Sequence, residues 1–498
     1  MGGRVAAGDG AATWRGAAFD SRKIQGNELF FALRGGVTDG HRYVAAAIAA
    51  GAGAAVIHQD LPEGTELPPG ANLIRVDDTY EALHALTRHV RFGGAGHARV
   101  PRRLVSITGS AGKTTTKELV TAVLGRRYRV AKNEGNFNNL YGFPLSLLGI
   151  PEDTEWMVAE MGMSSAGELS QLSRLSRPEV VVYTNVRPVH LEFFDSVRGI
   201  AEAKAELLEG LVPGGLVVAN ADDPEVRRFV RREAERRHAA GDEIDVAWYG
   251  RGGGDGEGPA PKVTARDVGP AGGGEPGSRF TLVVAGDGGG EVEVHLPVHG
   301  EYNVENFLAA AACGVRLGVP LAEIAAGAAQ VRSAAGRGSV HRLPGGGLLI
   351  DDTYNSNPDA LRRALASAAE LAAGRADAAT GRRWAVLGDM LELGPEGPRF
   401  HRECGAAAAE LGFAPVAGVG ELCRELVAGA RASGAEARWF ATAGEAADAL
   451  AGALAPGDVV LVKGSRGVGL DRVVERLLAA AGSDDPDPDD ADQDEGNG

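Results

Sequence analysis

Cysteine is almost absent from this chain of 498 residues, which contains only Cys313, Cys404 and Cys423. The three lie far apart in the sequence, and none belongs to a Cys-x-x-Cys pair. A disulfide framework needs several paired cysteines, and a structural zinc site needs ligands at close spacing, so neither is expected. This cysteine usage predicts a protein of a reducing compartment.

Long apolar stretches are missing as well. A helix needs about 18 consecutive apolar residues to cross a bilayer, and no such run occurs. The residues from Met1 to Gly16 are rich in glycine and alanine and lack the apolar centre of a secretion signal. We therefore expect a soluble, cytoplasmic protein that does not insert into a membrane.

Positive charge is in deficit. The chain has 51 lysines and arginines against 67 aspartates and glutamates, a formal net charge of -16, and it shows no basic stripe. This balance argues against nucleic acid as a partner. We also expect a monomer.

Some of the acidic residues lie between Asp484 and Glu495, in a segment without an apolar face. Residues 483–498 are therefore predicted to form a disordered acidic tail.

The length predicts three α/β domains, and 44% hydrophobic residues are enough to give each a core. The predicted bounds are 1–98 for a small N-terminal domain, 99–334 for a central domain with a parallel sheet and 335–482 for a C-terminal, Rossmann-like domain. In the last two, short apolar runs alternate with helical segments, as in βαβ units. Strands are expected at 54–57, 103–108, 156–160, 180–185, 215–220, 348–350, 384–387, 416–419 and 459–462.

A glycine-containing loop follows the expected strand 103–108 and precedes a helix. Glycines let backbone amides approach a phosphate, and the N-terminus of a helix favours an anion. Lys113 can neutralise ATP phosphates, and the Thr114 hydroxyl can reach Mg²⁺. The pattern is shorter than the usual Gly-x-x-x-x-Gly-Lys-Thr, and a tight turn is the alternative. The predicted ATP-binding residues are Gly109, Ser110, Ala111, Gly112, Lys113, Thr114 and Thr115.

Two further segments carry polar groups where a ligand is expected. Residues 133–139 are dense in amides and glycine, which suits a loop that binds a substrate through Asn136 and Asn139. Glu160 ends the strand 156–160, and the carboxyl ends of parallel strands are where open α/β sheets bind ligands. Glu160 is therefore a candidate magnesium ligand. A plain turn and a surface carboxylate are the respective alternatives.

Residues 108–118 resemble the ATP loop of the Mur ligases and folylpolyglutamate synthetases, and further segments from Asp20 to about Val474 resemble that family in the same order. The family has a substrate domain, an ATPase domain and a C-terminal Rossmann-like domain. The resemblance implies that His190 and a carbamylated Lys204 bind magnesium beside Thr114 and Glu160. It also implies that Asn303 contacts adenine, Arg337 reaches the ATP phosphates and Asp352 contacts the ribose. Lys113, Glu160, His190, Lys204 and Arg337 form the expected catalytic set.

Without that resemblance, several of these residues have ordinary interpretations. A lone histidine such as His190 is more often structural than a ligand. Lys204 could form a surface ion pair with Glu202 or Glu206, and Arg337 could be a surface arginine. These alternatives stay open at the level of the sequence.

The segment Asp351-Asp352-Thr353-Tyr354-Asn355-Ser356-Asn357-Pro358 resembles the family member that adds D-alanyl-D-alanine. Tyr354, Asn355 and Asn357 are accordingly expected to contact that dipeptide. The Asp-Asn-Pro-Arg segment of the diaminopimelate-adding members is not found in the chain. In the first domain, Ser21 lies in a region that resembles the family's UDP-recognition region.

The resemblance thus implies an ATP- and Mg²⁺-dependent ligase that joins D-alanyl-D-alanine to UDP-N-acetylmuramoyl-tripeptide through an acyl phosphate. The product would be the UDP-muramoyl pentapeptide precursor of peptidoglycan. The alternatives are a sibling ligase that adds one amino acid, a folylpolyglutamate synthetase, or a non-catalytic nucleotide-dependent binding protein. The third residue of the tripeptide, lysine or diaminopimelate, stays open.

Deleting residues 484–498 is predicted to leave activity and melting temperature nearly unchanged, because this segment has too little apolar area to order itself on the body. Paired activity and thermal-melting measurements on the full and truncated chains test the expectation. A clear loss of either in the truncated chain would show that the tail docks on the body.

Overall fold

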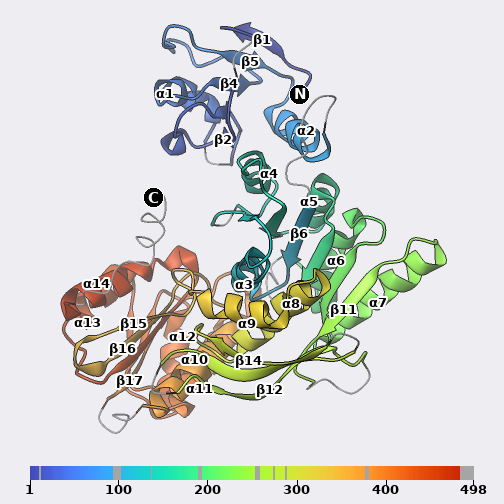
Figure 1. The fold of residues 1–498 in the computed structure, drawn as a ribbon. Helices are drawn as coiled ribbons and strands as arrows, with labels where there is room; N and C mark the ends of the chain where they lie inside the picture. The colour runs from blue at the N-terminus through green and yellow to red at the C-terminus, as the bar shows by residue number, and fades with distance from the viewer. Residues whose placement is uncertain are drawn as a thin grey trace.

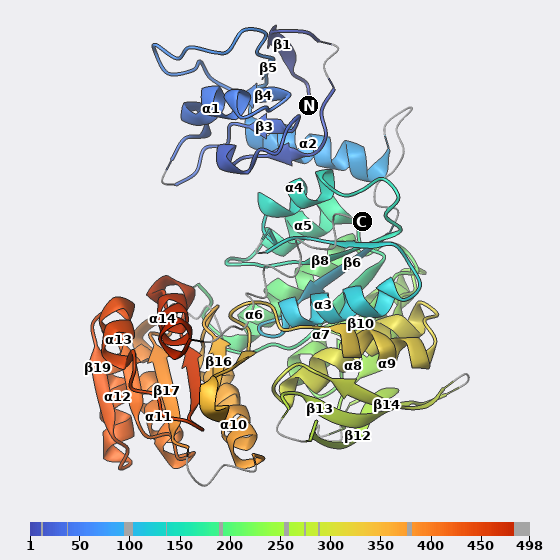
Figure 2. The same cartoon turned by 60° about the vertical axis from the view of Figure 1, so that its left-hand side comes forward.

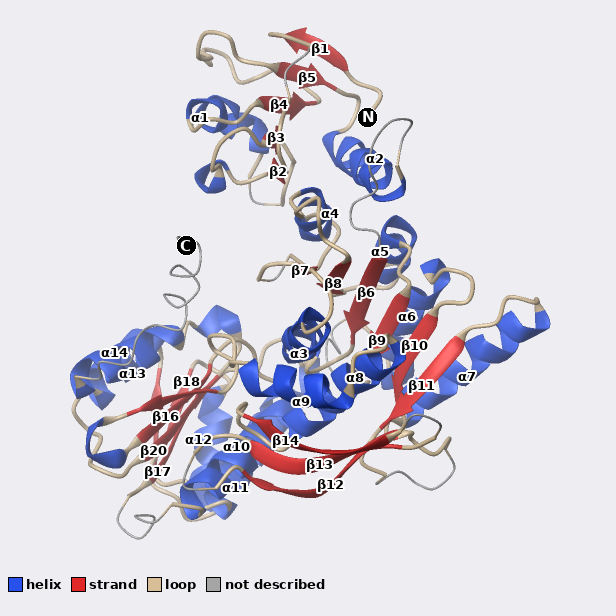
Figure 3. Ribbon diagram, in the orientation of Figure 1, coloured by secondary structure: helices blue, strands red, loops and turns tan. Residues whose placement is uncertain are grey.

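The computed structural model describes residues 1–10, 13–36, 38–93, 103–135, 137–188, 193–252, 258–272, 275–286, 289–375 and 381–482. The predicted acidic tail lies outside this part of the chain. Three sheets follow one another along the sequence, each with its own helices (Figures 1 and 3). The predicted three-part α/β architecture is therefore confirmed, while the exact domain bounds stay predictions. Within the described ranges, none of the helices has the length and apolar character needed to cross a membrane.

The N-terminal sheet has five strands in the order β1-β5-β4-β3-β2. Only the β1–β5 pair is antiparallel. The first residues, which look like a bare glycine-rich lead in the sequence, thus add an edge strand. The elements are β1 Arg4–Ala7, β2 Ala17–Ala18, η1 Ser21–Lys23, β3 Leu29–Phe31, η2 Gly40–Tyr43, α1 Val44–Ala49, β4 Ala54–Ile57, β5 Leu73–Arg75 and α2 Thr79–Phe92.

The central sheet has nine strands in the order β14-β13-β12-β11-β10-β9-β6-β8-β7. It is parallel from β7 to β12, as predicted, but β13 and β14 extend it as antiparallel strands. Its strands are β6 Arg103–Thr108, β7 Val130–Lys132, β8 Trp156–Glu160, β9 Val180–Tyr183, β10 Leu216–Asn220, β11 Asp245–Tyr249, β12 Val263–Pro270, β13 Ser278–Val284 and β14 Gly290–Leu296.

Helices cover both faces of the central sheet, because its strands are apolar on both sides. One core lies under α3, α8 and α9, and the other under α4, α5, α6 and α7. The bounds are α3 Lys113–Gly125, α4 Gly142–Leu148, α5 Glu168–Ser176, α6 Val197–Ala205, η3 Glu206–Gly210, α7 Pro224–Ala239, α8 Tyr302–Arg316 and α9 Leu321–Gln330.

The C-terminal sheet has six strands in the order β15-β16-β20-β17-β18-β19, and only β15 is antiparallel. Helices α10 to α12 cover one face, and α13 and α14 cover the other. The predicted open, doubly wound sheet is confirmed. The elements are β15 Ser339–Arg342, η4 Pro344–Gly346, β16 Leu348–Asp352, α10 Pro358–Ala373, β17 Arg383–Gly388, η5 Gly394–Glu396, α11 Gly397–Glu410, β18 Val416–Val419, α12 Cys423–Ala432, β19 Ala437–Phe440, α13 Ala443–Leu450, β20 Val459–Lys463, η6 Arg466–Val468 and α14 Asp471–Ala481.

The N-terminal and C-terminal units both contact the central one, from different sides (Figure 2). Helix α2 joins the N-terminal unit to the central sheet through Arg91, whose side chain is 1% exposed. The Arg91 guanidinium donates to the carbonyl oxygens of Ser176 and Arg177 and to both carboxylate oxygens of Glu179. Leu145 of α4 completes the core beneath α2. The joint is therefore buried and densely bonded.

Replacing Arg91 by methionine should lower the free energy of unfolding by about 3 kcal/mol, because removing one partner of a buried charge pair leaves the other unpaired. Urea unfolding followed by circular dichroism measures the change. Arg88→Met is the control, since Arg88 is exposed on the same helix. Equal stability of the two variants would contradict this account of the joint.

Candidate active site

The predicted phosphate loop lies between β6 and α3, and the neighbouring strand holds it in shape. Gly112 has a φ of 80° and precedes the first residue of α3, a conformation that glycine adopts without strain. Asn185, just after β9, accepts from the backbone amides of Ser110 and Ala111 through its carbonyl and side-chain oxygens. The Lys113 ammonium donates to the carbonyl oxygen of Gly109 at 3.0 Å. The loop is thus preformed.

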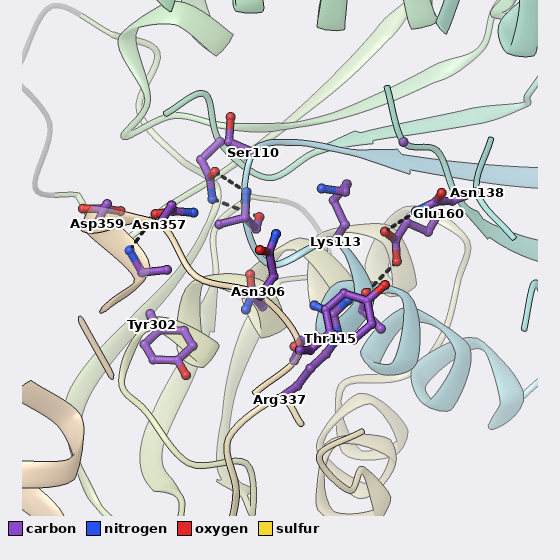
Figure 4. Close-up of a pocket in the computed structure, with 18 of the residues that line it drawn as sticks. Ser110, Lys113, Thr115, Asn138, Glu160, Tyr302, Asn306, Arg337, Asn357 and Asp359 are labelled. Carbon is purple, nitrogen blue, oxygen red and sulfur yellow. Dashed lines mark hydrogen bonds between the residues drawn. The ribbon is translucent and has the colours of Figure 1, made fainter. Parts of the chain in front are cut away.

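Glu160 ends β8 and faces this loop with only 3% of its surface exposed. Its Oε2 accepts from the Thr114 hydroxyl at 2.6 Å, and its Oε1 accepts from Asn138 Nδ2 at 2.9 Å (Figure 4). Burial raises the pKa of Glu160, but the charges of Lys113 and Arg337 and the two hydrogen bonds outweigh it and lower the pKa below its usual value. A buried, ionised carboxylate beside a hydroxyl is an oxygen donor set that fits Mg²⁺.

The C-terminal domain supplies the opposite wall. Arg337 lies in the loop before β15, and its guanidinium carbon is 3.7 Å from the centre of the Tyr354 ring. Asp352, at the end of β16, pairs through Oδ2 with Lys463 Nζ at 2.6 Å, and the same ammonium donates to the carbonyl oxygen of Asn355. The pair lies side by side because Asp352 and Lys463 are register partners in parallel strands.

Residues of both domains line a single cavity of about 350 Å³. Most of the predicted site residues are among them: Ser110, Ala111, Gly112, Lys113, Thr114, Thr115, Asn139, Glu160, Arg337, Asp352, Tyr354, Asn355 and Asn357. Gly109, Ser21, Asn303 and Lys204 are described but do not line it. Asn136 and His190 lie outside the described residues. The structure therefore assembles the predicted phosphate, ribose and dipeptide groups around one space.

Three asparagines assigned to substrates already use their side-chain oxygens locally. Asn357 accepts from the amide of Ala360 and begins α10, Asn355 accepts from the next amide, and Asn139 accepts from the amides of Tyr141 and Gly142. Within the described part of the chain, no group accepts a hydrogen bond from their Nδ2 atoms. These amide nitrogens therefore keep hydrogen-bonding capacity that a ligand in the cavity could use.

Asn303 is 1% exposed and buried behind the cavity wall. Its Nδ2 donates to the carbonyl oxygen of His299, and its Oδ1 accepts from Asn306 Nδ2 at 2.8 Å. Asn306, one turn further along α8, reaches the cavity instead. Asn303 thus orients Asn306, which the sequence prediction did not select although it lies on the same helix.

Lys204 is buried on α6 with 3% of its surface exposed. Glu202 pairs with Arg232, and Glu206 accepts from the backbone amides of Gly167 and Ser170. The alternative of a surface ion pair with either glutamate is therefore wrong. Burial, and then the nearby Lys113 ammonium, hold the pKa of Lys204 well below its usual value. Among the described residues, none pairs with its ammonium.

Ser21 begins η1 in the N-terminal unit, next to the amide loop, which we define as residues 133–135 and 137–139. Phe19 packs against Phe137 with ring centres 5.9 Å apart, and Lys23 Nζ lies 5.1 Å from the same ring. The predicted UDP-recognition region therefore contacts the amide loop, and the same loop contacts Glu160 through Asn138.

Two further functional candidates, besides Asn306, escaped the prediction. Asn138 was inside the amide loop, but only its contact with Glu160 distinguishes it from its neighbours. Lys463 ends a buried strand, the same signal that selected Glu160, and its side chain is 4% exposed. A lysine at the carboxyl end of a buried parallel strand is the signal that could have identified it.

Comparison with known proteins agrees with this geometry. The catalytic domain of the Mur ligase family matches residues 15–91, the Mur ligase middle domain matches 107–314, and the glutamate ligase domain of Mur ligases matches 336–466. The chain belongs to the Mur ligase family. The family resemblance inferred from the sequence is thus confirmed over most of its length.

Individual Mur ligases are similar over nearly the whole chain. The UDP-N-acetylmuramoyl-tripeptide–D-alanyl-D-alanine ligase of Bacillus subtilis strain 168 is 33% identical, with 93% of each chain covered. A crystal structure of MurF from Acinetobacter baumannii superimposes with a TM-score of 0.76 at 28% identity, covering 93% of each chain. MurF ligase from Thermotoga maritima, in complex with ADP, gives a TM-score of 0.72 at 25% identity, covering 94% of this chain and 98% of that one.

Proposed function

We propose that this Mur ligase joins D-alanyl-D-alanine to UDP-N-acetylmuramoyl-tripeptide, with conversion of ATP to ADP and phosphate. The product is the UDP-muramoyl pentapeptide from which peptidoglycan is built. The observation that carries the proposal is the cavity in which a phosphate loop and Glu160 face Arg337, Asp352 and Tyr354 of a second domain. The ligase from Bacillus subtilis, similar over 93% of the chain, supports the choice of substrates.

The two domains divide the work on ATP. The backbone amides of the phosphate loop and Lys113 hold the phosphates from one side, and Arg337 reaches the transferred phosphoryl group from the other. Phosphoryl transfer depends mainly on such positioning and on fixed positive charge. Asp352 binds the ribose, and Asn303 with Asn306 forms the adenine side. Nucleotide binding thus requires both walls of the cavity.

Magnesium fits the oxygen donors at Glu160 and Thr114, and His190 and a carbamylated Lys204 are the proposed ligands of a second ion. Ions bound by these residues would supply positive charge that neutralises the phosphates. A carbamate can form only on an uncharged amine. The buried Lys204 amine suits this requirement, because no group in the described part of the chain pairs with it. The uncharged amine is the form that adds carbon dioxide.

The peptide bond forms in two steps. The terminal carboxylate of the tripeptide attacks the γ-phosphorus, the bond to ADP breaks, and an acyl phosphate results. The amine of D-alanyl-D-alanine then attacks the acyl carbon, phosphate leaves with one carboxylate oxygen, and the amine loses a proton. Activation is needed because a free carboxylate is a poor electrophile. Ser21, Asn136 and Asn139 are proposed to hold the UDP-linked substrate, and Tyr354, Asn355 and Asn357 the dipeptide.

A sibling ligase that adds a single amino acid is the nearest alternative. The segment Asp351–Pro358 favours the dipeptide instead, and the diaminopimelate-adding signature Asp-Asn-Pro-Arg does not occur in the sequence. A non-catalytic nucleotide-binding protein needs a phosphate loop, but it does not need a buried carboxylate and a buried lysine in addition. We propose that the enzyme acts in the cytoplasm, because ATP and the nucleotide-linked substrate are found in that compartment, and that it acts as a monomer.

The purified chain should release phosphate only when the UDP-tripeptide and D-alanyl-D-alanine are both present, and mass spectrometry should show the pentapeptide. Lysine- and diaminopimelate-containing tripeptides identify the third residue. Lys113→Ala should lose about 100-fold or more of this rate, because one fixed charge that stabilises the transition state is removed. Lys262→Ala, at an exposed lysine, is the control. Turnover with single amino acids alone would replace the proposal with the sibling reaction.

Lys204→Ala should be almost inactive, and short carboxylic acids should partly restore its phosphate release by supplying the missing oxygen anion. The same acids should not restore Lys113→Ala, where a cation rather than an anion is missing. Initial rates with and without added acetate or formate make the comparison. Full activity of Lys204→Ala without any acid would show that no carbamate is needed at this position.

A further inference from the structure

Lys117 lies one helical turn beyond Lys113 on α3, behind the phosphate loop. Residues four apart occupy the same face of a helix, so Lys117 lies on the same face of α3 as Lys113, and its side chain is almost completely buried. Its ammonium donates to the carbonyl oxygen of Asn133 at 2.8 Å and lies 3.6 Å from Glu118 Oε1. Burial lowers the pKa of Lys117, against the opposing pull of Glu118 and Glu160.

Asn133 is the fixed end of the amide loop. It is completely buried, and its Oδ1 accepts from the backbone amide of Glu160 at 2.9 Å. Its Nδ2 donates to the carbonyl oxygens of Phe137 and Glu160. The Asn133 side chain therefore closes the amide loop and ties it to the end of β8, at the residue that carries the Glu160 carboxylate.

The other part of the amide loop contacts both the carboxylate at the end of β8 and the N-terminal unit, where the UDP-linked substrate is expected to bind. Asn138 Nδ2 donates to the Glu160 carboxylate, and the carbonyl oxygen of Asn138 accepts from the amide of Gly162 (Figure 4). Phe137 contacts Phe19 and Lys23 of the N-terminal unit. A shift of this loop would thus displace the carboxylate side and the UDP-substrate side together.

A buried ammonium is costly unless acceptors surround it, so an apolar residue would be the ordinary choice at this position of α3. The acceptors that Lys117 has are the Asn133 carbonyl and Glu118. We propose that Lys117 is a positioning residue that locks the amide loop to the phosphate-loop helix, so that the tripeptide carboxylate is held in register with ATP. The kinetic consequence rests on the proposed function; the mechanical coupling does not.

The test uses Lys117→Met, which keeps the length and apolar stem but removes the donor. Backbone hydrogen exchange of the peptide covering 133–141 should speed up about 10-fold, while exchange of the phosphate loop stays the same. The value of kcat/KM for the UDP-tripeptide should fall about 10- to 100-fold, as it does when a supporting hydrogen bond of a site is removed. Binding of ADP, measured by calorimetry, should be unchanged.

Lys132→Met is the matched control, because Lys132 pairs with the same Glu118 from an exposed position at the end of β7. It should change neither exchange nor kcat/KM. If Lys117→Met does not fold, Lys117→Gln replaces it, since glutamine keeps a polar group but is too short to reach the Asn133 carbonyl. The same expectations apply to it.

Unchanged exchange at 133–141 would overturn the proposal, as would faster exchange without any loss of kcat/KM. A fall in melting temperature with faster exchange throughout the protein would assign Lys117 a general structural role and overturn it too. If the wild-type chain does not turn over the UDP-tripeptide at all, the proposed function fails, and the exchange measurement alone then decides whether Lys117 holds the loop.

Discussion

The buried carboxylate of Glu160 is the constraint on which the rest of the site depends. A negative charge at 3% exposure is tolerable only with fixed donors and cations around it, and these come from three parts of the molecule. Thr114 comes from α3, Asn138 from the amide loop, and the facing charges are Lys113 and Arg337. The fold therefore has to bring the phosphate loop, the substrate loop and the C-terminal domain to one carboxylate.

The two outer domains meet the central one in different ways. Arg91, whose side chain is 1% exposed, fastens the N-terminal unit through a largely buried network. The C-terminal domain is joined by more exposed pairs, such as Arg187 with Asp359 and Arg363 with Glu305, at 3.7 and 3.8 Å. Such pairs contribute little stability. This contrast suits a ligase in which the UDP-substrate side stays fixed while the C-terminal wall closes on the nucleotide.

Much of this arrangement follows from the sequence, because strand ends and glycine loops have local signatures. The apolar runs at 103–108 and 156–160 placed Lys113 and Glu160 at the carboxyl edge of the sheet. Burial and partner choice are not local, so the sequence left Lys204 open between a surface ion pair and a carbamylated magnesium ligand. Asn303 and Asn306 differ by one helical turn, and only packing shows which of them reaches the cavity.

Isotope transfer from the tripeptide to phosphate tests the central claim most directly. A UDP-tripeptide labelled with oxygen-18 in its terminal carboxylate is incubated with ATP, D-alanyl-D-alanine and the enzyme, and the released phosphate is analysed by mass spectrometry. An acyl phosphate formed at this site requires one labelled oxygen in each phosphate released with product. Pentapeptide accompanied by unlabelled phosphate would contradict the account, because the carboxylate would then not have been activated by phosphorylation.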